Sequence, residues 1–252
     1  MTRVIALFNQ SGGVGKTTIT MNLGYQLASR GHRVLLIDMD PQASLTTFMG
    51  LDVGKQDKTI YDALISEEEL IPIYPNIHQM DLSPATILLA NAEQELVLAE
   101  QRELRLKEPL SDIQAQYDFI LLDCPPSLGI LSQISLVAAT HVLVPIQTQF
   151  KALMGTDSLL QTVKKVQRRL NKTLTFAGFC PTMYSPSNAL DQRTLEAITD
   201  QLAPLGRIFT PISRATALAE ASEYGKPLAL SPKKNVSVLA VFDEIAIAME
   251  QI

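Results

Sequence analysis

Length, composition and charge exclude several classes of protein. The chain has 252 residues, 46% of them apolar, which is enough for the core of one large domain, and its formal net charge is −5. It contains no run of about 18 apolar residues that could span a bilayer, and Cys124 and Cys180 lack the CxxC spacing of a zinc site or disulfide scaffold. The apolar start leads straight into glycines instead of a small-residue cleavage site. We therefore expect one cytoplasmic domain over residues 1–252 that does not act at a membrane.

Short apolar runs rich in β-branched residues alternate with longer segments of helical pattern. The runs that predict strands are residues 4–8, 34–38, 118–123, 141–146 and 175–180. The segments that predict helices are residues 16–30, 91–106, 152–170, 191–203 and 235–251. Continuously apolar strands are typical of a sheet buried on both faces. The alternation predicts a doubly wound α/β fold, with a mainly parallel sheet and helices on both faces.

The segment "NQSGGVGKTT", residues 9–18, is close to the phosphate-binding pattern GxxxxGK[ST]. It follows a predicted strand and opens a predicted helix, which is the context that such a loop needs. Glycines let backbone N–H groups close around phosphate oxygens at a helix N-terminus, a lysine adds a charge, and a threonine hydroxyl can bind Mg²⁺. The residues expected to bind ATP here are Ser11, Gly12, Gly13, Val14, Gly15, Lys16, Thr17 and Thr18, with Lys16 also counted as catalytic.

Gln10 stands where this pattern has its first glycine, and "GGVGKT" resembles the deviant Walker A box of the ParA/MinD family. Four further segments are similar to motifs of that family: "LLIDMDPQAS" (35–44), "YDFILLDCPPSLG" (117–129), "VLVPIQTQFKALMG" (142–155) and "EYGKPLALSPKKN" (223–235). The resemblance extends over nearly the whole chain. It implies an ATPase that uses ATP and Mg²⁺, forms a homodimer in the ATP state, and positions plasmids, chromosomes or large protein assemblies. Many members bind nonspecific DNA as dimers.

The resemblance also implies roles for three aspartates. Asp123 ends an apolar strand and should contact Mg²⁺ through water, and Asp38 should lie near the same ion together with Thr17. Asp40 matches the family carboxylate that positions the attacking water, so it is a catalytic candidate. Adenine is expected near residues 181–184 and 210–213, with Met183 and Pro211 as the contact residues.

One residue departs from the family motif. The family has a lysine at position 11 that reaches the partner's nucleotide, and Ser11 is short and neutral. Either the nucleotide chemistry of the dimer is impaired, or another cation takes that place, and Lys151 is the candidate for ATP binding and catalysis. The serine variant resembles the McdA branch, whose members space carboxysomes over the nucleoid.

Charge is distributed unevenly along the chain. Residues 1–150 carry 9 Lys/Arg and 17 Asp/Glu, a net charge of −8, whereas residues 151–252 carry 12 and 9, a net charge of +3. Scattered cations are enough for phosphate contacts, because such contacts require no base readout. The DNA-binding candidates are Lys164, Lys165, Arg168 and Arg169, which form one helical stripe, and Arg193, Arg214, Lys233 and Lys234.

The expected function is a slow ATPase that is stimulated by a small adaptor protein, binds nonspecific DNA as a dimer, and positions a plasmid, chromosome or carboxysome over the nucleoid. Two alternatives stay open. One is a metabolic P-loop enzyme, either a synthetase or an iron–sulfur protein whose cluster is shared between two chains through their cysteines. The other is a nucleotide-gated DNA-binding module with negligible turnover.

Overall fold

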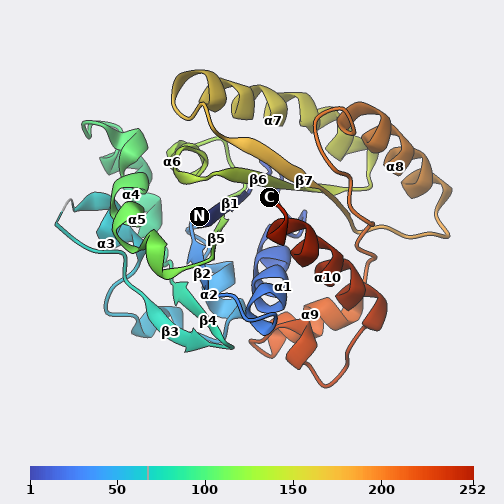
Figure 1. Cartoon of the computed structure of the whole chain (residues 1–252), viewed down its shortest axis with the longest axis horizontal. Helices are drawn as coiled ribbons and strands as arrows, with labels where there is room; N and C mark the ends of the chain where they lie inside the picture. The colour runs from blue at the N-terminus through green and yellow to red at the C-terminus, as the bar shows by residue number, and fades with distance from the viewer. Residues whose placement is uncertain (67) are drawn as a thin grey trace.

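One mainly parallel sheet organises the chain (Figure 1). The computed structural model describes residues 1–66 and 68–252, apart from the side chains of residues 150 and 152–154. Within this part of the chain the sheet has seven strands in the order β3-β4-β2-β5-β1-β6-β7. The strands are β1 (Arg3–Leu7), β2 (Val34–Asp38), β3 (Tyr74–Ile77), β4 (Met80–Ser83), β5 (Phe119–Asp123), β6 (His141–Gln147) and β7 (Thr175–Thr182). All neighbouring pairs are parallel except β3 and β4, so the predicted fold class is confirmed.

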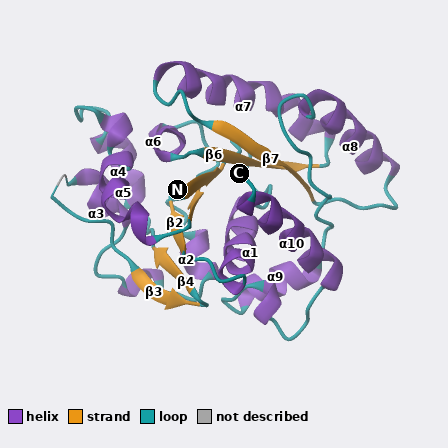
Figure 2. Cartoon of the chain, in the orientation of Figure 1, coloured by secondary structure: helices purple, strands orange, loops and turns teal. Residues whose placement is uncertain are grey.

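Helices cover both faces of this sheet (Figure 2). The α-helices are α1 (Lys16–Ser29), α2 (Ser44–Phe48), α3 (Ile60–Ile65), α4 (Leu89–Glu95), α5 (Lys107–Ile113), α6 (Ile130–Ala138), α7 (Phe150–Arg169), α8 (Ala189–Leu202), α9 (Thr216–Glu223) and α10 (Val236–Glu250). The 3₁₀ turns are η1 (Val53–Lys55), η2 (Arg102–Leu104), η3 (Gln114–Gln116) and η4 (Leu228–Leu230). No helix in the described ranges is both long enough and apolar enough to cross a membrane.

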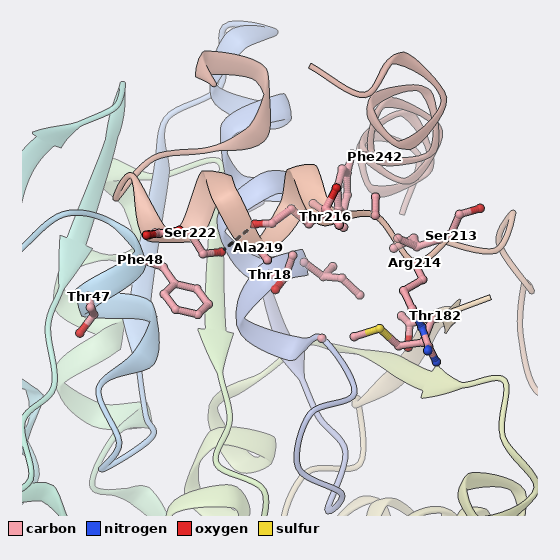
Figure 3. Close-up of a pocket in the computed structure, with 17 residues that line it drawn as sticks. Thr18, Thr47, Phe48, Thr182, Ser213, Arg214, Thr216, Ala219, Ser222 and Phe242 are labelled. Atoms are coloured by element: carbon pink, nitrogen blue, oxygen red, sulfur yellow. Dashed lines mark hydrogen bonds between the residues drawn. The ribbon is translucent and has the colours of Figure 1, made fainter. Parts of the chain in front are cut away.

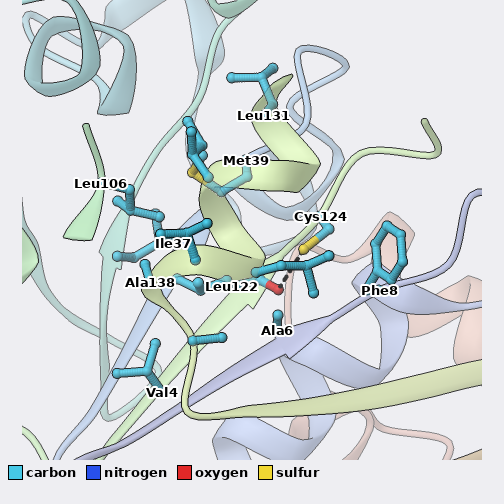
Figure 4. Packing of buried hydrophobic residues seen from close by; sticks show 14 of the residues in the cluster. Val4, Ala6, Phe8, Ile37, Met39, Leu106, Leu122, Cys124, Leu131 and Ala138 are labelled. Carbon is cyan, nitrogen blue, oxygen red and sulfur yellow. Dashed lines mark hydrogen bonds between the residues drawn. The ribbon is translucent and has the colours of Figure 1, made fainter. Parts of the chain in front are cut away.

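Alternate residues of each strand enter two separate cores. Val4 and Ala6 of β1 and Leu122 of β5 pack into the core under α3 to α8, part of which Figure 4 shows. Ile5 and Leu7 point the other way, into the core formed with α1, α2, α9 and α10. Since burying one such side chain contributes about 1.5–3 kcal/mol, the two cores fix the strand register firmly.

Helix α1 packs unusually close to the sheet because of a glycine. A Cβ atom on Gly24 would lie 2.7 Å from Leu36 Cδ2 and 2.9 Å from Met80 Sδ. The missing side chain therefore lets α1 approach β2 and β4, which fixes the helix that carries the phosphate loop.

One prediction about secondary structure was wrong, and two strands were missed. The expected helix over residues 91–106 is interrupted: α4 ends at Glu95, η2 follows at Arg102–Leu104, and Gln101 has φ 48° in the break. Leu96 and Leu106 are buried in one core on either side of the break, so tertiary packing overrides the helical periodicity. Strands β3 and β4 were not predicted, since each has only four residues and β3 contains a proline, which is tolerated at a sheet edge.

The carboxylate of Glu250 ties the end of α10 to the end of α1. Arg30 donates to its two oxygens over 2.8 and 3.0 Å, and His32 Nε2 lies 2.9 Å from Oε1. The hydrogen bonds from Arg30 and His32 lower the pKa of Glu250 from 4.5 to about 2. A lowered carboxylate pKa stabilises the fold above the unfolded pKa, and this stabilisation is lost as the pH falls from about 4.5 to about 2.

We predict that Glu250→Gln lowers the free energy of unfolding by about 1 kcal/mol at pH 7 and by less at pH 3. Urea unfolding at both pH values measures the difference. Glu196→Gln, at an exposed position of α8, is the control and should match the parent at both. A deficit that is equally large at pH 3 would contradict the ion-pair explanation.

Candidate nucleotide site

Strand register brings the predicted motifs to one edge of the sheet. The phosphate loop, residues 8–15, connects the end of β1 to α1, and Leu7 is paired with Asp123 at the end of β5. Asp123 is paired in turn with Asp38 at the end of β2. Since ligands of open α/β sheets bind beyond the carboxyl ends of the strands, this edge is the candidate site.

The phosphate loop is anchored by Asn9, a residue that the motif analysis did not select. Its Nδ2 donates to Pro145 O of β6 over 2.7 Å, and its Oδ1 accepts from Ser11 N over 2.9 Å. At the other end of the loop, Val14 O accepts from Thr182 Oγ1 of β7 over 2.9 Å. The loop is thus fixed from both sides by neighbouring strands.

Left-handed backbone explains the glycines of this loop. Gly13 has φ 71°, and Gly15, the N-cap residue just before α1, has φ 91°. Residues with a side chain rarely adopt such φ angles. Glycine is therefore needed here for the backbone to turn its N–H groups toward a phosphate at the helix N-terminus.

Lys16 is buried within the loop that it serves. The residue is only 6% exposed, and its Nζ donates to Asn9 O over 2.9 Å and to Ser11 O over 3.0 Å. Burial lowers the pKa of Lys16, and the carboxylate of Asp123 partly opposes this effect. Additional negative charge beside the ammonium would therefore stabilise it, and a phosphate would provide that charge.

Two buried carboxylates, those of Asp38 and Asp123, belong to paired residues at this edge of the sheet. Thr17 Oγ1 donates to Asp123 Oδ2 over 2.7 Å, and Thr20 Oγ1 donates to Oδ1 over 3.2 Å. Burial raises the pKa of both Asp38 and Asp123, and their mutual repulsion, together with Asp40, adds to the increase at Asp123. The pair is therefore unfavourable without a cation.

These groups fit a magnesium ion held together with phosphates. Mg²⁺ takes oxygen ligands and is usually bound by one or two carboxylates plus substrate phosphates, not by an all-protein cage. The described residues contain no group of three or more His, Cys, Asp or Glu side chains that could form such a cage. Thr17, Asp38 and Asp123, the residues predicted to hold the ion, supply the hydroxyl and carboxylate oxygens that this chemistry needs.

Asp40 lies beside the carboxylate pair in a tight turn. It is 9% exposed, its N–H donates to Asp38 Oδ1 over 3.2 Å, and its own Oδ1 accepts from Gln42 N over 2.9 Å. A carboxylate in this place can orient a water molecule without leaving the loop, which is consistent with the predicted catalytic role.

A cavity of about 730 Å³ extends from the start of α1 between α2 and α9 (Figure 3). Gly15, Thr18 and Met183 line it, and Met183 has φ 55°, a strained conformation that a nearby functional site can explain. Pro211 is not among the described lining residues, whereas its neighbours Ile212 and Ser213 are. The two segments expected near adenine therefore both border this cavity, and whether they contact a base stays a prediction.

Ser11 and Lys151 lie on segments that are joined by hydrogen bonds. Gln10 Nε2 donates to Gly155 O over 2.9 Å, and Gln147 Nε2 donates to Gly13 O over 2.8 Å. Lys151 is an exposed residue in the first turn of α7, between these two attachments along the chain. The start of α7 is therefore held against the phosphate loop.

The predicted DNA-binding residues are not gathered in one place within the monomer. Four are exposed at the end of α7, namely Lys164, Lys165, Arg168 and Arg169. Arg193 lies on α8, and Lys233 and Lys234 lie between α9 and α10, the helices of the opposite face. Arg214 is exposed and lies on the wall of the cavity.

Comparison with known proteins agrees with this geometry. Residues 2–176 match the family model described as AAA domain. The chain is 40% identical to the sporulation initiation inhibitor protein Soj of Bacillus subtilis over 91% of both chains, and 41% identical to the chromosome-partitioning ATPase Soj of Treponema pallidum over 90% and 89%. The chain belongs to the ParA/Soj family of ATPases. Like its relatives that are named as ATPases, the chain hydrolyses ATP.

Among solved structures, the cobyrinic acid a,c-diamide synthase of Mycobacterium smegmatis with a bound ATP analogue and magnesium is similar throughout. Its TM-score is 0.86 and its identity 32%, with 100% of this chain and 95% of that chain covered. The predicted assignment to the McdA branch is not supported. The ATP complex of Cyanothece McdA has a TM-score of 0.89 but only 24% identity, over 99% and 96% of the chains, which shows a shared fold alone.

We predict that Asp123→Asn raises the melting temperature of the nucleotide-free protein by several degrees and abolishes ATP hydrolysis. The change removes a buried charge from the carboxylate pair, and an amide oxygen can still accept from Thr17. The pKa of Asp123 is raised from 3.8 to about 8, so the cost of burying it is absent below about pH 4, grows as the pH rises to about 8 and is constant above that. Calorimetry at pH 5 and pH 8 should find the larger gain at pH 8. An equal gain at both, or a loss, would contradict the argument.

Proposed function

We propose that this chain is a partitioning ATPase that acts on a chromosome. Its ATP-bound form is a homodimer that binds DNA without sequence preference, in the cytoplasm and on the nucleoid, and a small adaptor protein stimulates hydrolysis. The observation that supports this most is the convergence of Lys16, Asp38, Asp40 and Asp123 at one sheet edge beside the cavity. The identity of about 40% with proteins named for chromosome partitioning favours this cargo over a carboxysome.

The chain's own groups suggest how ATP is held and cleaved. The N–H groups of the loop and Lys16 hold the β- and γ-phosphates, with phosphate oxygens replacing the carbonyls of Asn9 and Ser11 as partners of the ammonium. Mg²⁺, when bound through Thr17 and the carboxylate pair, neutralises charge on the phosphate oxygens. Asp40 orients the attacking water, and most of the rate enhancement is electrostatic.

A dimer also explains how DNA binding can depend on ATP. One monomer presents four neighbouring cations at the end of α7 and only scattered cations elsewhere. Two copies joined at their nucleotide edges double this number in one particle, and each phosphate contact adds to the affinity by counterion release.

We predict that ATP with Mg²⁺ doubles the mass of the protein in light scattering, whereas ADP or no nucleotide does not. Filter binding should then detect unrelated DNA duplexes only with ATP, and the affinity should fall steeply with salt. Lys16→Ala should remain a monomer that binds neither ATP nor DNA. One mass in all three states, or a marked sequence preference, would count against the proposal.

The α7 stripe gives a sharper version of the DNA test. The double variant Lys164→Ala, Arg168→Ala should keep ATP-dependent dimerisation and lower DNA affinity. Because each copy loses two phosphate contacts, the slope of log affinity against log salt should become less steep by about two for each copy in the dimer. Lys55→Ala, an exposed lysine of η1, is the matched control and should bind DNA like the parent.

The synthase named among the solved structures favours a second candidate, a metabolic enzyme that uses the same loop. This candidate predicts an oligomeric state that does not change when ATP is added, and no binding to DNA. The buried cysteines offer little support for a shared iron–sulfur cluster, because Cys124 and Cys180 are both free and inside the two cores. A nucleotide-gated module without turnover would show dimerisation and DNA binding but no phosphate release.

We further propose that Lys151 supplies the charge that Ser11 lacks. Two triphosphates facing each other in a dimer repel, and a pair of unit charges about 4 Å apart is worth about 4 kcal/mol at an effective dielectric near 20. The hydrogen bonds of Gln10 and Gln147 support this role, since they join the start of α7 to the phosphate loop.

We predict that Lys151→Ala weakens ATP-dependent dimerisation at least tenfold, equivalent to about 1.4 kcal/mol, while the melting temperature stays unchanged. Sedimentation equilibrium with ATP measures the dimer constant. Ser11→Lys in the same chain should restore part of it, and Lys172→Ala, an exposed lysine beyond the far end of α7, should have no effect on it. Parent-like dimerisation of Lys151→Ala would show that this lysine is only a surface residue.

A further inference from the structure

Thr46 of α2 is a buried threonine whose hydrogen bonds converge on Asp38. The residue is 0% exposed. Its hydroxyl donates to Asp38 Oδ2 over 2.7 Å, and its backbone N–H donates to the same oxygen over 2.9 Å. The hydroxyl oxygen also accepts from Ala85 N over 3.0 Å. One side chain thus connects the end of β2, helix α2 and the segment after β4.

The direction of these bonds is fixed by the donors available. The N–H of Ala85 can only donate, so it takes a lone pair of the Thr46 oxygen and leaves the single hydroxyl proton for Asp38. Asp38 Oδ2 therefore receives two donors from Thr46. Oδ1 receives one longer bond, 3.2 Å from Asp40 N, so it is the oxygen with acceptor capacity to spare.

The turn that leads to Thr46 is strained, which indicates that its position matters. Ala43, the residue before α2, has φ 51°, a left-handed conformation that is unfavourable for a residue with a side chain. Ala43 N donates to Asp40 O over 2.8 Å and closes the turn. This strain is offset where the turn brings α2 back over the end of β2, at the bonds from Thr46 to Asp38.

We propose that Thr46 is a positioning residue for the magnesium site: it holds Asp38 by Oδ2 and so leaves Oδ1 for the ion or its bound water. The inference rests on the proposed use of Mg²⁺ and ATP. Its anchor is independent of α2, because the Ala85 N–H that fixes the hydroxyl belongs to the segment after β4, and β4 pairs with β2. Hydrogen-bond partners that orient metal-binding groups change metal affinity by about tenfold to a hundredfold when removed.

The experiment compares Thr46→Val, which has the same shape without the hydroxyl, with Thr46→Ser, which keeps it. Titrating Mg²⁺ into the protein with a fluorescent ATP analogue gives the Mg²⁺ concentration for half-maximal tightening of nucleotide binding. Thr46→Val should raise this concentration about tenfold or more, whereas Thr46→Ser should leave it close to the parent value. Affinity for the analogue in EDTA should be the same in all variants, because the phosphate loop is untouched. Thr194→Val, which removes another buried hydroxyl bonded within α8, should behave like the parent.

Several outcomes would overturn the inference. They are a parent-like Mg²⁺ titration of Thr46→Val, an equal loss of affinity in EDTA, or a failure of Thr46→Ser to restore the titration. Thr46→Ala, which avoids the added methyl group, is the second variant if Thr46→Val does not fold by circular dichroism; if neither folds, the hydroxyl is structural and the proposal fails. A parent protein whose nucleotide affinity does not respond to Mg²⁺ would instead refute the use of the ion, which is a distinguishable result.

Discussion

The structure depends on charged groups that are buried at one edge of the sheet. Lys16, Asp38 and Asp123 are each at most 6% exposed, and they lie at the ends of neighbouring strands or at the start of α1. Burial favours the neutral form of each group, so it lowers the pKa of the lysine and raises the pKa of the carboxylates. Burying these groups costs stability, which a bound ligand of opposite charge can offset. A nucleotide with a magnesium ion supplies an anion for the lysine and a cation for the carboxylates.

The surrounding fold holds these charges in place through backbone and side-chain bonds. The parallel register of β2, β5 and β1 fixes the order of the carboxylates and the loop, and the two cores fix that register. Asn9 and Thr182 attach the loop to β6 and β7. The hydroxyls of Thr17, Thr20 and Thr46 satisfy the carboxylates. In a flexible loop, Lys16 and the carboxylates could form ion pairs with one another. The rigid strands and the anchored loop prevent this and keep the charged groups positioned for a ligand.

The sequence predicted the parts of the site that follow from local spacing. The glycines, Lys16 and Thr17 could be placed because a phosphate loop is contiguous, and Asp38 and Asp123 because each ends an apolar strand. Asn9 and Gln147 were missed, since their partners Pro145 and Gly13 lie far away in the chain. Thr46 was missed because its contact with Asp38 depends on the turn that brings α2 back over β2, which spacing alone does not show. Spacing also does not show which residue of a loop faces a cavity: Ile212 lines it and Pro211 does not, because this depends on side-chain direction.

The fold followed the same division between local and distant information. Long apolar strands and long helices were predictable, whereas the β3–β4 edge and the break at Gln101 were decided by what they pack against. The helical pattern of residues 91–106 is present in the sequence, but burying both Leu96 and Leu106 in one core requires the chain to turn between them.

Under our proposal, charge that a loop lysine would bring to the nucleotide comes from Lys151 of α7, since Ser11 is short and neutral. A lysine at position 11 would lie in a loop whose carbonyls already bind one ammonium, that of Lys16. Moving the second cation to α7 separates the two positive charges in the nucleotide-free protein and lets solvent hydrate the exposed one. The hydrogen bonds from Gln10 and Gln147 keep that helix start against the loop. A cation on α7 can therefore act at the nucleotide without the repulsion that a second loop lysine would bring, so the same dimer chemistry is compatible with a different source of charge.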